Sequence, residues 1–433
     1  MKKVFLWILV VIIVVVLGVW GYLTVRQSAS GDAQIHVQSK AVVRISVDRM
    51  LTSLAKNALI HPGTYFGGKK EPKRDSLERI KIWESGWDIP ANVYLFSLQN
   101  DPNTYYTIQS LKDKEAFAKF LKVNFALEPV LVEGTQFYFV QARNQRSAVL
   151  FSQDRFVVGF GLGAAERLTI MRDLLENIKN LTTAKSMQLD TLEADLLYTD
   201  LQNKSVVKTN FYNGNIKLEG NIYTALWHAP EQATARQLDT SSVAYGWLNA
   251  DLRPVLNQYK DSLEKHKIPV DTLSKYLGGY VDMQWKKDPV KQIDTIVTYD
   301  LDDNFEMSEK KEVREAEVPD LQFVIRSSPH LAAYLPEKMF YKFKKQVKGD
   351  LIALNTGTPA DFTDTRNNVP NYFYMHLRED SWNRIFVKKD SGSAWNHIEN
   401  ITLSATRTTA DWSVLKGEIK LKQGDIHALY QLF

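Results

Sequence analysis

The 433-residue chain contains no cysteine. This absence excludes disulfides, thiolate-ligated zinc, thiolate-held iron–sulfur clusters, a thiol nucleophile and the lipid-bearing cysteine of a lipoprotein. The chain also lacks an excess of either charge, because 54 Lys+Arg against 50 Asp+Glu leave a net charge of only +4. A dedicated nucleic-acid binder is far more basic, so we expect no nucleic-acid partner.

The signature motifs of common enzymes are missing as well. The sequence has no G-x-S-x-G nucleophile elbow, no G-x-x-x-x-G-K-[ST] phosphate loop and no H-E-x-x-H zinc motif. Its eight histidines are scattered without the close pairing of a metal site. We therefore predict no catalytic residue, no cofactor and no metal, although a triad assembled from distant residues leaves no sequence signature.

One glycine-rich segment matches a cofactor-binding pattern. Residues 159–164 read GFGLGA, follow the strand-like segment RFVVGF and open a helical pattern. A dinucleotide fingerprint also requires a second parallel strand that ends in an acidic residue. Residues 182–195 are instead typical of loop and helix. We interpret the segment as a tight glycine turn between a strand and a helix.

Residues 4–25 form an uncharged and almost entirely apolar run. As a helix, this run would span roughly 33 Å, which is enough to cross a hydrocarbon core of about 30 Å. Trp20 and Tyr22 lie near its end, where amphipathic rings prefer the lipid headgroups. We predict a transmembrane helix over residues 4–25, through which the chain contacts the membrane.

The flanking charges predict the orientation of this span. Lys2 and Lys3 precede it, and Arg26 is the only cation of the next dozen residues. The positive-inside rule then makes residues 1–3 a cytoplasmic tail of a single-pass inner-membrane protein with a periplasmic or otherwise extracytoplasmic C-terminal region. A cleaved signal peptide is the alternative, with small residues at 28–30 near a cleavage site, but a signal h-region is shorter.

The region after the span contains a repeat. GNIKLEGNI at 214–222 matches GEIKLKQGDI at 417–426, and the two IKL cores are 203 residues apart. VVRISVD at 42–48 matches VAYGWLN at 243–249 at nearly the same offset. We predict a tether over 26–38, one repeat over 39–230, a linker over 231–237 and a second repeat over 238–433.

Each repeat mixes strand and helix patterns. Alternating segments rich in aromatic and β-branched residues predict strands, for example over 93–98, 104–108 and 147–151. Helical spacing falls at 113–124 and 164–181. The expected fold class is therefore α+β, with an N-terminal transmembrane helix followed by two tandem related domains of mainly antiparallel sheets packed by helices.

Three segments carry a resemblance to a known family. They are VVRISV at 42–47, TYYTIQSLKDKEAFAKFLK at 104–122 and GEIKLKQGDIHALYQL at 417–432. Together they resemble uncharacterised bacterial cell-envelope proteins, a family with a domain of unknown function. The resemblance implies duplicated α+β domains behind a signal or anchor, and it brings no catalytic residue. Lipid-anchored members differ from this chain, which has no cysteine to modify.

Two function classes follow from these observations. The first is a single-pass, membrane-anchored envelope protein whose exported region is a non-catalytic binding or scaffolding module, with an envelope protein or a ligand as its partner. The alternative is a membrane-anchored envelope hydrolase that acts on glycans or peptides, with its site between the two repeats. The anchor, the repeat and the missing motifs favour the first.

Overall fold

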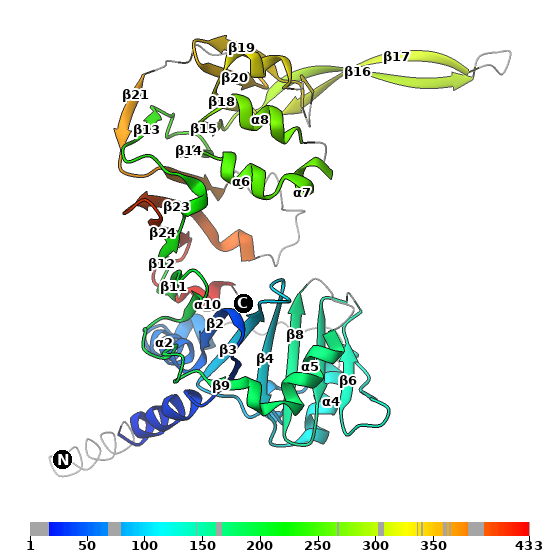
Figure 1. The fold of residues 1–433 in the computed structure, drawn as a ribbon, viewed down its shortest axis with the longest axis vertical. Helices are drawn as coiled ribbons and strands as arrows, with labels where there is room; N and C mark the ends of the chain where they lie inside the picture. Colours follow the sequence, from blue (N-terminus) through cyan, green and yellow to red (C-terminus); the bar gives the residue numbers. More distant parts are fainter. Residues whose placement is uncertain are drawn as a thin grey trace. The chain divides into compact units, whose positions relative to one another are not determined.

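The computed structural model describes residues 17–67, 79–143, 145–161, 167–265, 268–301, 307–335, 337–338, 341–357, 362, 365–379 and 394–432. The chain divides into two compact units, Met1–Asn213 (unit 1) and Gly214–Phe433 (unit 2). Figure 1 shows both units, with unit 1 drawn in blue to green and unit 2 in green to red. Each unit is described by itself below.

Unit 1 begins with a helix over residues 17–30. Its further elements are β1 (Gln34–His36), β2 (Ser39–Ser46), α2 (Val47–Ile60), α3 (Pro62–Phe66), η1 (Ile82–Glu84), β3 (Asn92–Leu98), β4 (Thr104–Ser110), α4 (Lys114–Phe125), β5 (Val130–Leu131), β6 (Tyr138–Gln141), β7 (Ser147–Phe151), β8 (Arg155–Gly161), α5 (Arg167–Glu176), η2 (Ile178–Asn180), β9 (Leu181–Thr183), β10 (Leu196–Asp200) and β11 (Val206–Phe211).

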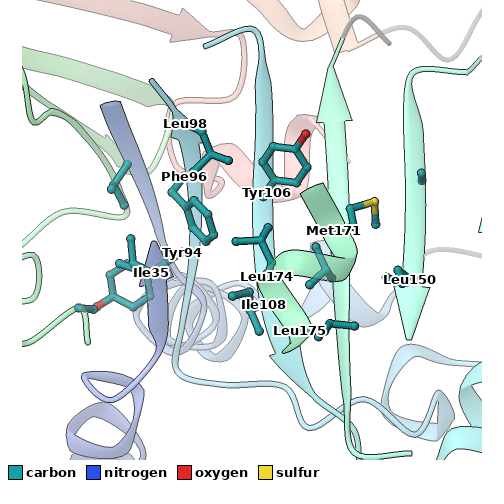
Figure 2. Packing of buried hydrophobic residues seen from close by; sticks show 14 of the residues in the cluster. Ile35, Tyr94, Phe96, Leu98, Tyr106, Ile108, Leu150, Met171, Leu174 and Leu175 are labelled. Carbon is teal, nitrogen blue, oxygen red and sulfur yellow. The ribbon is translucent and has the colours of Figure 1, made fainter. Parts of the chain in front are cut away.

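An antiparallel sheet organises unit 1, with the strand order β11–β10–β2–β3–β4–β8–β7–β6–β5. Helix α5 packs against β4, β7 and β8. Figure 2 shows the core of this layer, in which Phe96 of β3 and Tyr106 of β4 gather with Met171 of α5. All three side chains are fully buried, and such aromatic and long apolar residues dominate the energetics of a core.

Unit 2 begins with β12 (Asn215–Tyr223). Its further elements are η3 (Ala225–Trp227), β13 (Ala233–Arg236), β14 (Ala244–Asn249), α6 (Arg253–Gln258), α7 (Lys260–Lys265), α8 (Val270–Tyr276), β15 (Leu277–Trp285), β16 (Val290–Leu301), β17 (Met307–Val318), β18 (Leu321–Ser327), η4 (Pro329–Ala333), β19 (Lys344–Lys348), β20 (Leu351–Asn355), β21 (Arg366–Val369), β22 (Phe373–Arg378), η5 (Ala394–His397), β23 (Ile398–Arg407), β24 (Trp412–Leu421) and α10 (Ala428–Leu432).

Unit 2 is also organised by an antiparallel sheet, with the strand order β12–β24–β23–β22–β14–β15–β18–β20–β19. Two further strand pairs stand outside this order, β13 with β21 and β16 with β17. The β16–β17 hairpin projects from the rest of unit 2 as a long two-stranded ribbon (Figure 1). Its second strand, β17, has the strongly charged sequence MSEKKEVREAEV.

The two units pair their strands in the same sequence. In unit 1, five neighbouring strands of the sheet have the order β2–β3–β4–β8–β7. The first three follow their order in the sequence, and the last two are exchanged. In unit 2 the order β14–β15–β18–β20–β19 repeats this plan, including the reversal at the end. Strands β12 and β24, which carry the matching IKL cores, pair with each other so that Ile216 faces Ile419. We propose on the basis of these matches that the two units arose by duplication of one domain.

The expected α+β fold class is wrong. The structure is mostly β, with 41% strand and 28% helix and a large antiparallel sheet. The helix expected over 164–181 is shorter, because α5 ends at Glu176 and residues 181–183 form β9. Strand β9 pairs with β1, about 150 residues earlier in the chain, and such a long-range partner overrides local helical spacing.

The N-terminal expectations also change. No helix within the described residues has both the length and the apolar character needed to cross a membrane. Residues 4–16 of the predicted span lie outside the described residues, and residues 17–25 belong to the helix over 17–30. In place of the tether expected over 26–38, the helix continues to residue 30 and β1 follows. The linker expected over 231–237 contains the strand β13.

Candidate functional site

A groove of about 750 Å³ lies on unit 1 between the helix over 17–30, helix α2 and the ends of β10 and β11. We call it the α2 groove. Its lining combines aromatic and aliphatic side chains with charged and hydroxyl side chains. The lining residues are Trp20, Leu23, Thr24, Gln27, Ser28, Asp48, Arg49, Thr52, Ser53, Lys56, Asp190, Asp195, Asn210, Phe211 and Tyr212.

Local sequence explains how α2 reaches this position. Strand β2 buries alternate residues between β3 and β10, and α2 begins at Val47, directly after it. The backbone N–H of Ser46 donates to the carbonyl of Asp195 at 2.8 Å, so the end of β2 is tied to the start of β10. Successive turns of α2 then place Arg49, Thr52 and Lys56 along one wall of the groove.

An ion pair fastens the helix over 17–30 to α2. Arg26 donates from Nε to Oδ2 of Asp48 at 2.8 Å and from Nη2 to Oδ1 at 2.9 Å. The same Nη2 donates to the carbonyl of Ile89 at 3.0 Å. The bond to Asp48 raises the pKa of Arg26 above its usual range. Because this bidentate pair is partly buried, it fixes one wall of the groove relative to the other.

A buried carboxylate forms the floor. The side chain of Asp195 is 5% exposed and accepts from Nε of Arg49 at 3.0 Å. Its second oxygen accepts from the backbone N–H of Phe211 at 2.7 Å. The exposed Glu193 accepts from Nη1 of the same arginine at 3.1 Å. Asp195 therefore joins α2, the start of β10 and the end of β11, and it holds Arg49 in a single orientation.

The open side of the groove carries a cation and aromatic rings. Lys56 is exposed and has no ion pair within the part of the chain that the structure describes. Trp20 and Tyr212 are exposed by 67% and 47%. Aromatic side chains and arginine are enriched at protein interfaces, whereas most free surfaces are richer in lysine and glutamate. Among the described residues, the groove therefore offers apolar contact area together with two charges that have no ion pair, the ammonium of Lys56 and the carboxylate of Asp190.

The clamp between the two helices leads to a first prediction. Replacing Arg26 with glutamine removes a bidentate pair whose side chains are 25% and 13% exposed. We expect the coupling between R26Q and D48N in a double-mutant cycle to be about 1 kcal/mol, as for partly exposed pairs of good geometry. Hydrogen exchange of the amides at 27–30 measures the loosening. Unchanged exchange in both variants would show that the pair does not hold the helix.

Unit 2 contains a separate, closed polar cluster. Arg236 of β13 donates from Nε and Nη2 to the two carboxylate oxygens of Asp282 at 2.8 and 3.0 Å. Their side chains are only 3% and 0% exposed. The hydroxyl of Tyr280 donates to Asp282 at 2.9 Å, and burial raises the pKa of Tyr280 above its usual range. The ion pair attaches β13 to strand β15 of the sheet. Because its side chains are closed to solvent, we interpret the cluster as structural and not as a ligand site.

The glycines of the segment over 159–164, which matched a cofactor fingerprint, are explained by packing where the structure describes them. Gly159 and Gly161 lie within β8, and residues 162–166 are outside the described residues. A Cβ on Gly159 would lie 3.1 Å from the ring of Tyr106, and one on Gly161 would lie 2.4 Å from the carbonyl of Asn103. Close packing therefore requires glycine at position 161 and leaves little room for a side chain at position 159.

The sequence-predicted absence of a metal site stays a prediction. Within the residues that can be described, the structure places no three His, Asp or Glu side chains where they could hold a metal ion. Sequence reasoning named no site residue. Asp48 lines the α2 groove and Asp282 anchors the closed cluster. Neither role has a signal in the local sequence.

Comparisons with known proteins give no family. No protein-family model matches the chain, and no curated protein matches it. One solved structure with some similarity is described as "Structure of crystal form III of TP0453". Its TM-score is 0.22 at 8% sequence identity, over 74% of this chain and 89% of that chain. A similarity this weak carries no argument about fold or function.

Proposed function

We propose that this protein is a membrane-attached, extracytoplasmic binding module without catalytic activity, and that the α2 groove receives a segment of a partner protein. One observation carries the proposal. The helix over 17–30, which forms one wall of the groove, includes the last nine residues of the apolar run over 4–25. A partner that enters the groove is thereby held beside the site of membrane attachment.

The charges around the apolar run support the proposed location. Lys2 and Lys3 precede the run, and the cation that follows it, Arg26, is neutralised by Asp48. A positive tail on one side and a compensated cation on the other favour retention of the N-terminus in the cytoplasm. The two folded units would then lie on the opposite side of the membrane.

The residue types in the groove support a protein segment as the ligand. Leu23, Phe211 and Tyr212 provide apolar surface, while Arg49 and Lys56 provide positive charge. Asp48 and Asp195 are both engaged by arginines, so within the described residues the charge without an ion pair on α2 is that of Lys56, and Asp190 is the remaining carboxylate of the lining. The chemistry therefore fits a segment with apolar side chains and at least one carboxylate.

A capture experiment with matched lysine variants tests this function. The full-length protein is purified from solubilised membranes as wild type, K56E and K119E, and the retained proteins are identified by mass spectrometry. Lys119 is an exposed helical lysine of α4, outside the groove. We expect wild type and K119E to retain the same partner and K56E to lose it, because the reversed charge repels the partner's carboxylate. Equal retention by K56E would contradict binding in the groove.

A further inference from the structure

Helix α2 leaves several large apolar residues exposed, while Val47, Met50 and Leu54 are half-buried. Its one fully buried residue is Asn57, which is 2% exposed and accepts a hydrogen bond from the hydroxyl of Tyr65. Leu51 and Leu59 are exposed by 56% and 80%, and Ile60 by 69%. A surface helix normally turns its apolar residues to the core and its polar residues to water. The outer face of α2 therefore suits an apolar environment.

Exposed apolar residues occur along both α2 and α3. Leu51, the exposed Ala55 and Leu59 are spaced four residues apart, so they lie on one face of α2. Phe66, at the end of the adjoining α3, is exposed by 75%. We call these residues, together with Ile60, the α2–α3 surface. Exposed apolar groups that gather in this way mark a contact with a partner or a membrane.

The α2–α3 surface begins at the clamp that holds the N-terminal helix. Asp48, in the first turn of α2, binds Arg26, and Arg26 directly follows the apolar run over 4–25. The fourteen residues of α2 extend only about 21 Å from this point. The helix over 17–30 itself exposes Trp20 and Val25, by 67% and 69%. The α2–α3 surface and the exposed apolar residues of the helix over 17–30 thus both lie next to the ion pair between Arg26 and Asp48.

We propose that the α2–α3 surface lies in the headgroup–acyl boundary of the membrane to which the N-terminal segment is attached. This inference rests on the proposed membrane attachment. Interfacial helices combine bulky apolar residues on one face with cations on the adjoining face. Lys56, which is exposed on the adjoining face of α2, provides such a cation and can approach anionic lipid headgroups. The membrane would then orient unit 1 through two contacts.

The absence of cysteine allows a direct test in the full chain, because every introduced thiol is unique. The single-site variants L59C, F66C, Y22C and V130C carry an environment-sensitive fluorophore and are reconstituted into vesicles of anionic and zwitterionic phospholipid. Y22C reports the N-terminal attachment. V130C reports β5, where Val130 is 66% exposed without belonging to the α2–α3 surface. The readouts are the emission shift, quenching by spin-labelled lipids and quenching by aqueous iodide.

We expect L59C and F66C to show blue-shifted emission, quenching by shallow spin-labelled lipids and loss of iodide quenching, while V130C stays accessible to iodide. Lipid quenching of Y22C with full iodide quenching of L59C and F66C would overturn the inference and leave the attachment intact. Iodide quenching at all four sites would contradict the attachment itself. Protection of L59C and F66C that is lost when the protein is diluted at a constant amount of lipid would overturn the inference in favour of a second protein copy.

Discussion

Replacing Arg236 with methionine is expected to lower the free energy of unfolding of unit 2 by about 3–5 kcal/mol. The substitution leaves the Asp282 carboxylate, which is 0% exposed, without its bidentate partner. Removing one member of a buried ion pair costs this much because the remaining charge has no solvent to stabilise it. Urea unfolding followed by hydrogen exchange of the β15 amides measures the change within unit 2.

Two further variants make this prediction specific. R253M removes an arginine whose side chain is 59% exposed in its pair with Asp251, and we expect a much smaller loss because water solvates the remaining charge. R236M/D282L removes both buried charges, so a large part of the lost stability should return. Equal losses in R236M and R253M would show that the buried pair does not hold β13 on the sheet.

Replacing Asp195 with alanine is the second change with a large expected effect, about 2–3 kcal/mol in unit 1. The variant leaves the backbone N–H of Phe211 and the Nε of Arg49 without their acceptor. Loss of a buried charged acceptor costs this much because the partly buried donors that remain are only incompletely solvated. Urea unfolding with hydrogen exchange of β10 and β11 measures the effect, and the same variant should lose the captured partner.

The neighbouring carboxylate supplies the control. Glu193 bonds the same arginine, but its side chain is 87% exposed. E193A should therefore change stability by less than about 1 kcal/mol and leave partner capture intact. A loss in E193A as large as in D195A would place the stabilising contact outside the buried floor of the groove.

Much of the local structure could be predicted because its signals are short-range. Helix α4 is confirmed close to the expected 113–124, since Asp113 caps it by accepting from the N–H groups of Glu115 and Ala116. Phe117 and Leu121 lie on one face, four residues apart, and both are buried. The strands expected over 93–98, 104–108 and 147–151 are also confirmed.

The fold class was missed because several strands have no local strand pattern. Strand β19 has the sequence KKQVK, which suits a helix end, and it becomes a strand only by pairing with β20. Strand β9 likewise depends on β1. Long-range pairing contributes as much to strand formation as intrinsic preference does, so these elements carry little signal in a single sequence.

The α2 groove was equally invisible to sequence reasoning. Asp48 and Asp195 are 147 residues apart and meet because β10 pairs with β2, immediately before α2. Asp48 has the appearance of a first-turn acid at a helix start, which is a common structural role. Its bidentate bond to Arg26 depends on where the helix over 17–30 packs, and no motif spacing encodes that arrangement.

The central claim, that the α2 groove binds a partner at the membrane, is tested most directly by photo-crosslinking in intact cells. A photoreactive amino acid replaces Tyr212 at the groove or Val130 on β5, each in the full-length chain. We predict one discrete crosslinked envelope protein from position 212, its loss when K56E is added, and no such product from position 130. No crosslink from position 212, or the same product from both positions, would contradict the account.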